Sequence, residues 1–509
     1  MTRAMPLHEL LEGLALAPPG LDPLVSGLGA DSRALRAGDA FIALAGESTH
    51  GLRHLDQAEA AGASVILFEP PAPDAVKLPA NAIAFPGLRA RQGELADRFY
   101  GAPSRALAVA GVTGTNGKTS TVQLLAQALT LGGGVAGSIG TLGAGLHGQL
   151  VAGERTTPDV IAVHRLLAEM RDAGATHVAM EVSSHALEQG RVDAVAFQVA
   201  VFTNLTRDHL DYHGDMASYW AAKEALFGWP GLQAAVINID DAKGASLAQA
   251  LHGHGLDVWT CSRRGPALLQ ARALSGADGL AFEVIEGGAV HTLHTDLMGD
   301  YNIDNLLGVT GGLRALGVSL ADAVQACSHL TAVPGRMQRV HADQPSVLAG
   351  LAEHALPLVV VDYAHTPDAV SHALMALRSQ AAARGGRLWC VLGCGGDRDA
   401  LKRPLMAAAA ESVAHHLVLT SDNPRSELPA QIVQDMRQGL QAPDKAHQEL
   451  DRAKAIFQTI LQAGQHDVIL IAGKGHEDTQ EIAGVKYPFD DRLHAHEALV
   501  KRANGVKQM

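Results

Sequence analysis

The sequence is poor in cysteine and in aromatic residues, and it has no long apolar run. Four cysteines in 509 residues are too few for a disulfide framework. Aromatic residues make up 4% of the chain, whereas 47% of the residues are hydrophobic and 18% are charged, as in folded rather than disordered proteins. No apolar segment approaches the length that spans a bilayer, and the N-terminus lacks the features of a signal peptide. We therefore expect a cytoplasmic protein.

Basic residues are also in the minority. The formal net charge of −13 argues against broad binding to nucleic acid or to acidic membranes, although local basic pockets remain compatible with it. We accordingly expect no nucleic acid partner and no membrane insertion. As a separate expectation, the protein is a monomer. Cys390 and Cys394 flank a predicted strand end, and we expect small buried side chains there rather than a metal site. The length exceeds what one core accommodates and indicates three domains.

Residues 106–130 carry the pattern of a strand, a turn and a helix. The run 106–112 is apolar and β-prone, and a helical segment starts at about Thr119. Gly114 and Gly117 lie in the turn between them and allow successive backbone N–H groups to face one point, beside the positive end of the new helix. A loop of this kind binds phosphate.

The side chains at the start of this helix extend the prediction. Lys118 is placed to reach terminal phosphates, and the hydroxyl of Thr119 or Ser120 is placed to hold a magnesium ion. Five residues separate Gly111 from Gly117, one more than in the Walker A pattern. An ordinary strand–turn–helix with a surface lysine is the alternative, but Gly-Lys-Thr at this junction favours a nucleoside-triphosphate site.

Strand-like and helix-like runs alternate from residue 106 to about 334, as in a mostly parallel α/β sheet. Glu181 and His209 follow two of the apolar runs, where strand ends of open sheets place ligands. Singly, each is more often a capping or solvated residue, but with the phosphate loop they are compatible with a hard-cation site. Lys223 lies in a helical segment and by default faces solvent beside glutamates.

The chain on either side of this region is also of α/β type. Residues 1–103 contain short β-like runs at 40–45, 64–68 and 82–85, and Ser32 lies in a sequence typical of a cap or turn. Residues from about 335 onward contain β-like runs, each followed by a polar or glycine-rich phrase: DYAHTPD, GCGGDRD, SDNPRSE and AGKGHED. We expect these loops to lie at one sheet edge, where they bring together charged and polar residues: Asp362, His365, Arg398, Asp422, Asn423, Arg425, Lys474, His476 and Glu477.

Such an edge suits a ligand with both a carboxylate and an ammonium group. The arginines are able to bind a carboxylate bidentately, and Glu477 is able to hold an ammonium group, so an amino acid fits. The alternative for each residue is a solvated loop charge.

These phrases, together with GTNGKTS, TTPD, EVSSHAL and FTNLTRDHLDYHG, resemble the Mur ligase family in order and over nearly the whole chain. Members of that family are ATP-dependent amide-forming enzymes of peptidoglycan assembly. The resemblance implies three α/β domains: an N-terminal UDP-substrate domain at 1–103, a central P-loop ATPase-like parallel sheet at 104–335 and a Rossmann-like amino-acid domain at 336–509.

The resemblance also implies roles for individual residues. ATP would be bound by Gly114, Thr115, Asn116, Gly117, Lys118, Thr119, Ser120, Asn302, Asn305, Arg336, Asp362 and His365. The UDP-muramoyl dipeptide would be bound by Ser32, Thr156, Thr157, Ser183, Gln189 and Arg191, and the incoming amino acid by Arg398, Asp422, Asn423, Pro424, Arg425, Gly473 and Glu477. Magnesium would be held by Thr119, Glu181, His209 and Lys223, the last as a carbamate. Lys118, Lys223 and His209 would be catalytic.

Arg425 decides the substrate that the resemblance implies. Family members that add meso-diaminopimelate carry the DNPR phrase, and the second carboxylate of that amino acid is a partner for an arginine. An unpaired buried arginine would penalise lysine. The other readings are a lysine-adding or D-Ala-D-Ala-adding Mur ligase, a folylpolyglutamate synthase with the same ATP core, or, from another class, a P-loop regulatory ATPase.

Overall fold

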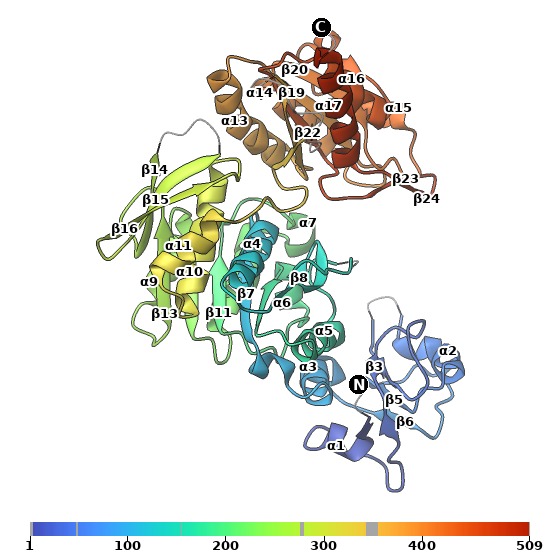
Figure 1. Cartoon of the computed structure of the whole chain (residues 1–509). Helices are drawn as coiled ribbons and strands as arrows, with labels where there is room; N and C mark the ends of the chain where they lie inside the picture. The colour runs from blue at the N-terminus through green and yellow to red at the C-terminus, as the bar shows by residue number, and fades with distance from the viewer. Residues whose placement is uncertain (1–3, 47–48, 154, 275–278, 343–354, 508–509) are drawn as a thin grey trace. The chain divides into compact units, whose positions relative to one another are not determined.

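The computed structural model describes residues 4–46, 49–153, 155–274, 279–342 and 355–507 (Figure 1). The chain forms two compact units. The first unit comprises residues 1–270, 285–289 and 305–326, and the second comprises residues 271–284, 290–304 and 327–509. Each unit is built around parallel strands.

The N-terminal part of the first unit is a small parallel sheet of order β3-β4-β5-β6. Its elements are β1 (Met5–Pro6), α1 (Leu7–Leu11), β2 (Leu24–Val25), β3 (Leu28–Gly29), β4 (Ala40–Ala43), α2 (Leu55–Ala60), β5 (Val65–Phe68), β6 (Ala82–Ala84) and α3 (Leu88–Phe99). The side chains of β4 and β5 alternate between two cores: Ile42 and Leu67 pack with α1 and α3, while Phe41 and Ile66 pack with α2. Three of these strands lie where the sequence predicts them.

The central sheet has the order β16-β15-β14-β13-β12-β11-β7-β10-β8-β9. Its strands are β7 (Ala108–Thr113), β8 (Ala136–Gly140), β9 (Gly143–Leu146), β10 (His177–Glu181), β11 (Val199–Phe202), β12 (Ala234–Asn238), β13 (Asp257–Ser262), β14 (Leu269–Leu274), β15 (Leu280–Glu286) and β16 (Ala289–Thr295). The helices are α4 (Lys118–Leu131), α5 (Val160–Asp172), α6 (Ser184–Glu188), α7 (Leu210–His213), α8 (Met216–Glu224), α9 (Ala242–Leu251), α10 (Tyr301–Ala315) and α11 (Leu320–Ser328).

Strand β7 lies in the middle of this sheet and pairs in parallel with β10 and β11. The parallel pairing places the carboxyl ends of β7, β10 and β11 at one edge, so that the segments after Thr113, Glu181 and Phe202 emerge together. One face of the sheet packs against α5, α8 and α9 through residues such as Met180, Phe202 and Leu167. The edge that carries the predicted chemistry is therefore supported by a buried core.

The second unit contains a sheet of order β17-β18-β22-β19-β20-β21, parallel except for β17. Its elements are β17 (Gln338–Val340), β18 (Leu358–Asp362), α13 (Pro367–Ala383), β19 (Leu388–Cys394), α14 (Lys402–Val413), β20 (His416–Ser421), α15 (Pro429–Arg437), β21 (His447–Gln448), α16 (Arg452–Gln462), β22 (Val468–Ala472), β23 (Thr479–Ile482), β24 (Val485–Pro488) and α17 (Asp491–Lys507).

Alternate residues of these strands face two cores, as the near-continuous apolar runs require of a sheet covered on both faces. Leu470 and Leu392 pack against α13, α14 and α15, whereas Ile471 and Val391 pack against α16 and α17. Figure 1 shows the helices on both sides of this sheet. Cys390 and Cys394 both belong to the first of these cores, and both side chains are buried, as the sequence predicts.

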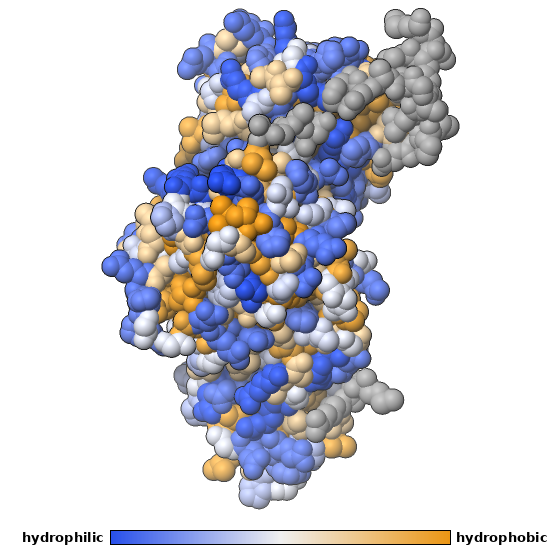
Figure 2. Space-filling model, turned by 60° about the vertical axis from the view of Figure 1, so that its left-hand side comes forward, coloured by the Kyte–Doolittle hydropathy of each residue, from blue (hydrophilic) through white to orange (hydrophobic). Residues whose placement is uncertain are grey.

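The surface is predominantly polar in the view of Figure 2, where hydrophobic residues form small groups among hydrophilic ones. Within the described residues, no helix combines the length and the apolar character that crossing a membrane would need.

Candidate functional site

The phosphate loop joins β7 to α4 and has the backbone shape that its glycines predict. Gly114 has φ 145° and Gly117 has φ 84°, conformations that side chains rarely adopt. A Cβ on Gly114 would lie 1.9 Å from Thr203 Oγ1, and one on Gly117 would lie 2.5 Å from Asn305 Oδ1. The glycines are therefore required both by conformation and by the close approach of neighbouring segments.

The segment after β11 holds the loop in this shape. Thr115 N donates to Asn204 O at 2.8 Å, and Asn116 N donates to the side-chain oxygen of Asn204 at 3.0 Å. Thr203 Oγ1 donates to Asn116 O at 2.6 Å. Because these bonds come from a neighbouring parallel strand, the loop is pre-formed at the sheet edge.

Two lysines converge on one carbonyl oxygen of this loop. Lys118 Nζ donates to Gly114 O at 2.9 Å and to Thr115 O at 2.7 Å. Lys223 Nζ, which comes from α8, donates to the same Gly114 O at 2.8 Å. Two ammonium groups at one neutral acceptor repel one another, so this point favours an anion or a lysine without its charge.

The default placement of Lys223 in solvent beside glutamates is wrong. Lys223 is 1% exposed, and its Nζ lies 4.5 Å from the centroid of the Tyr219 ring. Burial, with a smaller contribution from the positive charge of Lys118, lowers the pKa of Lys223 from 10.5 to about 6. Its amine is therefore neutral at pH 7, which the helical periodicity of α8 did not indicate.

Glu181, at the end of β10, is the centre of a second polar cluster. It is 1% exposed, and its Oε1 accepts a hydrogen bond from Thr141 N at 2.8 Å. Thr141 Oγ1 lies 3.1 Å from Thr156 Oγ1, and Thr157 Oγ1 donates to Glu181 O at 2.8 Å. Ser183 N in turn donates to Thr157 Oγ1 at 3.3 Å. The structure thus joins Glu181 to three residues predicted for the UDP substrate.

Gln189 and Arg191 extend this cluster. Arg191 Nη1 donates to Thr157 O at 3.0 Å, and its Nε donates to Gln189 Oε1 at 3.0 Å. Burial, with the nearby charge of Arg155, lowers the pKa of Arg191, which shows a guanidinium in partly desolvated surroundings. Ser32 lies apart from this cluster, in the turn between β3 and β4, where it is buried and donates to Gln57 Oε1 at 2.8 Å.

The expected metal ligands are only partly drawn together. His209 is the left-handed residue (φ 52°) before α7, its side chain is half exposed, and its ring lies 4.8 Å from that of His185. Thr119 is 8% exposed at the start of α4. Among the residues that the structure describes, no three His, Cys, Asp or Glu side chains surround a common point. Buried Glu181 oxygens and the Thr119 hydroxyl are of the chemical type that magnesium prefers.

The two asparagines of α10 are both buried. Asn302 Nδ2 donates to Met298 O at 2.7 Å. Asn305 places its Oδ1 beside Gly117 and 3.5 Å from the hydroxyl of Thr121. The two asparagines lie one helical turn apart on α10, and Asn305 reaches the phosphate loop.

At the carboxyl end of β18, Asp362 accepts from Met337 N at 2.7 Å, and burial raises its pKa despite the nearby Arg336. Arg336 lies 4.6 Å from the centroid of the Tyr363 ring. His476 lies in the same cluster, and burial together with the charge of Arg336 lowers its pKa to about 4. His365 is exposed and contacts Tyr363 O through Nδ1 at 2.8 Å.

The loops after β19, β20 and β22 meet at one edge of the second sheet, as the sequence predicts. Gly396 N donates to Asn423 O at 2.9 Å, and Pro424 O packs against Gly396. Gly473 has φ 116°, and a Cβ there would lie 2.6 Å from Asp422 Oδ2. Arg398 is exposed on the loop after β19.

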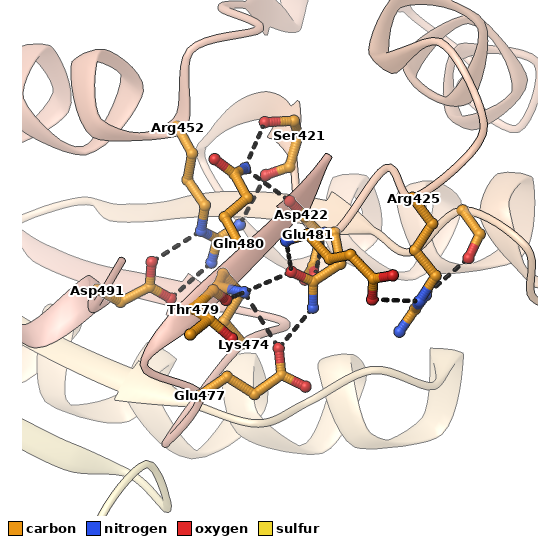
Figure 3. A network of polar contacts seen from close by, with 12 residues as sticks. Ser421, Asp422, Arg425, Arg452, Lys474, Glu477, Thr479, Gln480, Glu481 and Asp491 are labelled. Atoms are coloured by element: carbon orange, nitrogen blue, oxygen red, sulfur yellow. Dashed lines mark hydrogen bonds and ion pairs between the residues drawn. The ribbon is translucent and has the colours of Figure 1, made fainter. Parts of the chain in front are cut away.

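The hairpin β23–β24 completes this edge, and Figure 3 shows its contacts. Arg425 N donates to Glu481 O at 3.0 Å, and Ala483 N donates to Arg425 O at 2.7 Å. Gln480 Nε2 donates to Asp422 O at 2.6 Å. These bonds hold Arg425 in its left-handed conformation (φ 50°).

The charged side chains of this pocket are paired with one another (Figure 3). Arg425 Nη1 donates to Gly396 O at 2.6 Å, and its Nε lies 3.5 Å from Glu481 Oε2. Glu477 Oε2 accepts from Asn423 Nδ2 at 2.7 Å. Arg425 and Glu477 thus lie at the same sheet edge, and each is held by protein partners.

Thr141, Tyr219, Gln480 and Glu481 contact predicted site residues, yet the sequence analysis missed them. Their partners are between 15 and 104 residues away along the chain, so no local motif marks them. The polar residues of β23 offered a usable signal, because Gln480 and Glu481 come within three residues of the end of the predicted loop AGKGHED.

A parallel sheet whose central strand ends in a glycine turn of the phosphate-loop shape, together with a second α/β unit whose charged loops meet at one sheet edge, is the architecture of a three-domain α/β protein. Comparison with known families agrees: the Mur ligase family catalytic domain matches residues 24–100, the Mur ligase middle domain residues 112–312 and the Mur ligase glutamate ligase domain residues 335–475. The chain belongs to the Mur ligase family, and the expected fold class is confirmed.

Individual relatives are similar over the full length. The UDP-N-acetylmuramoyl-L-alanyl-D-glutamate–2,6-diaminopimelate ligase of Xanthomonas campestris pv. campestris (strain 8004) is 55% identical over 511 residues, covering 100% of both chains. The ligase of that name from Acidovorax sp. (strain JS42) is 49% identical, covering 93% of this chain and 94% of its own. A solved structure of such a ligase has a TM-score of 0.70 at 33% identity and covers 100% of each chain.

Proposed function

We propose that this protein joins meso-diaminopimelate to the D-glutamate residue of UDP-N-acetylmuramoyl-L-alanyl-D-glutamate at the expense of ATP, a step of peptidoglycan precursor synthesis. The observation that carries the proposal is the 55% identity over the whole length to a ligase named for these substrates. Because ATP is an intracellular cosubstrate, the proposal places the protein in the cytoplasm. We keep the domain boundaries 1–103, 104–335 and 336–509 as part of it.

The first unit would bind ATP and the UDP substrate. Residues 114–120 form the pre-formed phosphate loop, Lys118 would neutralise the terminal phosphates, and Asn305 reaches the loop from α10. Thr156, Thr157, Ser183, Gln189 and Arg191 share one hydrogen-bonded cluster, which supports their common assignment to the UDP-muramoyl dipeptide, with Ser32 at its uridine end. Asn302, Arg336, Asp362 and His365 belong to the second unit, and their assignment to ATP rests on the resemblance to the family.

Magnesium would be held by Thr119, Glu181, His209 and Lys223, the last as a carbamate. The oxygen-rich donor set fits a hard cation, and the neutral amine of Lys223 is the form that reacts with carbon dioxide. Carbamate formation replaces an uncharged nitrogen by an anionic oxygen ligand next to Lys118. Bound magnesium would supply charge neutralisation for phosphoryl transfer.

The second unit would bind diaminopimelate. Arg425 would pair with its distal carboxylate, Glu477 would accept a hydrogen bond from an ammonium group, and Arg398, Asp422, Asn423, Pro424 and Gly473 would line the same pocket. Lysine lacks the distal carboxylate, so it would leave Arg425 without its ligand partner.

The proposed reaction has two steps. The D-glutamate carboxylate attacks the γ-phosphorus of ATP, and the bond to the β–γ bridging oxygen breaks, giving an acyl phosphate and ADP. The free amine of diaminopimelate then attacks the acyl carbon, loses a proton and expels phosphate as the amide forms. Lys118 would stabilise the charge that develops on the phosphoryl oxygens.

Magnesium-dependent phosphate release with UDP-N-acetylmuramoyl-L-Ala-D-Glu tests the proposal when meso-diaminopimelate and L-lysine are supplied in parallel. Release with diaminopimelate alone would support both the reaction and the pocket. Release with lysine alone would keep the ligase and overturn the assignment of Arg425. Phosphate release at the same rate with and without an amine would indicate a regulatory ATPase. No phosphate release with either amine would redirect the search to D-alanyl-D-alanine or glutamate as the acceptor.

A further inference from the structure

Lys474 is a buried cation at the base of the amino-acid pocket, and neither the proposed reaction nor the proposed substrate contacts use it. Its side chain is fully buried at the end of β22, and all three of its amino hydrogens have acceptors. Nζ donates to Asn423 Oδ1 at 3.0 Å, to Glu477 Oε2 at 3.1 Å and to Thr479 O at 2.6 Å. With its donors committed and no exposed surface, Lys474 is not placed to touch a ligand.

The first acceptor fixes the orientation of a pocket amide. Asn423 Oδ1 receives hydrogen bonds from Lys474 and from Glu481 N, the latter at 3.0 Å. Because two donors face Oδ1, the nitrogen Nδ2 must point the other way, where it donates to Glu477 Oε2 at 2.7 Å. The usual ambiguity between the two ends of an asparagine amide is thereby removed.

The second acceptor fixes a pocket carboxylate. Glu477 Oε2 accepts from both Lys474 and Asn423, so one oxygen of this carboxylate is turned to the pocket base (Figure 3). Within the described part of the chain, the hydrogen bonds to this carboxylate go to Oε2. Oε1 is then the oxygen left for the ammonium group of an amino acid.

The third acceptor ties this arrangement to the hairpin. Thr479 begins β23, and Gln480 and Glu481 of the same strand bond to the loop after β20. A single ammonium group therefore connects the loop after β20, the loop after β22 and the hairpin. Burying a cation is costly unless every donor is satisfied, and such a residue is expected where its contacts serve a geometric purpose.

We propose that Lys474 is a positioning residue of the amino-acid pocket, which orients Glu477 and Asn423 so that Glu477 Oε1 meets the ammonium group of the incoming amino acid. The inference rests on the proposed function, because it assigns that ammonium group to diaminopimelate. A positioning role for Lys474 differs from a general structural role because loss of Lys474 should weaken the use of diaminopimelate and leave the binding of ATP and of the UDP substrate unchanged.

The test is steady-state kinetics of Lys474→Met, Lys474→Arg and the control Lys454→Met. Lys454 belongs to the same unit and forms a surface ion pair with Glu449 at 2.6 Å. We expect Lys474→Met to raise the KM for meso-diaminopimelate about tenfold or more, while the KM for ATP and for the UDP substrate stays within about twofold. Lys474→Arg keeps the charge but not the three-acceptor geometry, so it should raise the same KM, and Lys454→Met should change it less than about twofold.

A double-mutant cycle shows whether Lys474 acts through Glu477. Glu477→Gln alone should raise the KM for diaminopimelate, and adding Lys474→Met should then change it by less than about twofold. If the effects of Glu477→Gln and Lys474→Met on the KM for diaminopimelate multiply in the double variant, the inference is overturned. It is also overturned if the Lys474 variants behave like Lys454→Met, or if they raise the KM values of all three substrates together. If Lys474→Met does not fold, the same comparison is made with Lys474→Arg. Wild-type protein that fails to use diaminopimelate would instead overturn the proposed function.

Discussion

The phosphate loop and the proposed amino-acid pocket arrange positive charge in different ways. In the phosphate loop, the Lys118 cation donates to the backbone carbonyls of Gly114 and Thr115, and the neutral amine of Lys223 shares the oxygen of Gly114. In the amino-acid pocket, Lys474 lies against Glu477 and Arg425 lies against Glu481. Cations that face neutral carbonyls gain most from an anionic ligand, whereas cations with carboxylate partners are compensated before the ligand arrives. The first arrangement suits a polyphosphate and the second suits a zwitterion.

Removing the cation of the phosphate loop, Lys118, should have the largest effect. We expect Lys118→Met to lower kcat/KM for phosphate release by about a thousandfold, because the charge that develops on the phosphoryl oxygens then loses its main protein partner. Thermal unfolding should change little. Lys243→Met, at an exposed position of α9 in the same unit, is the control, and a loss of less than about tenfold in the first variant would contradict the reading of the loop.

Removing the pocket arginine should alter selectivity more than turnover. For Arg425→Ala we expect the ratio of kcat/KM for meso-diaminopimelate to that for L-lysine to fall about a hundredfold, because the variant has no charged partner for the distal carboxylate. The ratio is measured in parallel assays with saturating ATP. An unchanged ratio would remove Arg425 from the specificity of this pocket.

The neutral state of Lys223 predicts a pH-dependent stability. Its pKa is lowered from 10.5 to about 6, so between these pH values the unfolded chain holds a proton that the native state lacks, and wild-type stability rises with pH. Lys223→Met should therefore be more stable than wild type by on the order of 5 kcal/mol at pH 7, with a difference that shrinks towards pH 10.

Denaturant unfolding in buffer free of carbon dioxide measures this difference. Bicarbonate should reduce it, because a carbamate on the wild-type lysine would stabilise the native state. A difference that does not vary with pH would show that Lys223 is not neutral in the folded protein.

We expect the smallest effect on the KM for meso-diaminopimelate from a change of Glu481, the counterion of Arg425. Glu481 is partly exposed and lies 3.5 Å from Arg425 Nε, so Glu481→Gln should raise the KM for meso-diaminopimelate only about threefold. Glu449→Gln, which removes a surface carboxylate paired with Lys454, is the matched control. A lower KM would indicate that Glu481 competes with the ligand carboxylate rather than orienting the arginine.

The elements that bear the site could be predicted because their signals are local. Short sequence patterns predict the turn glycines of the phosphate loop and the strands that precede the pocket loops. They also predict the start of α4 to within one residue. The gathering of the loops at one edge also followed, because parallel strands present their carboxyl ends together. The positions of Asp422 beside Gly473 and of Asn423 beside Glu477 are consequences of that rule.

Lys223 and Lys474 show what local patterns do not contain. Both are lysines in polar-looking segments, for which exposure is the ordinary expectation, yet both are buried. Lys223 meets Gly114, 109 residues away, and Lys474 meets Asn423, 51 residues away. The sequence by itself determined the order of the elements, the phosphate loop and the likeness to a ligase family. Only the tertiary structure decided which charges are buried and paired, because burial depends on strands and loops that are distant in the chain and adjacent in the fold.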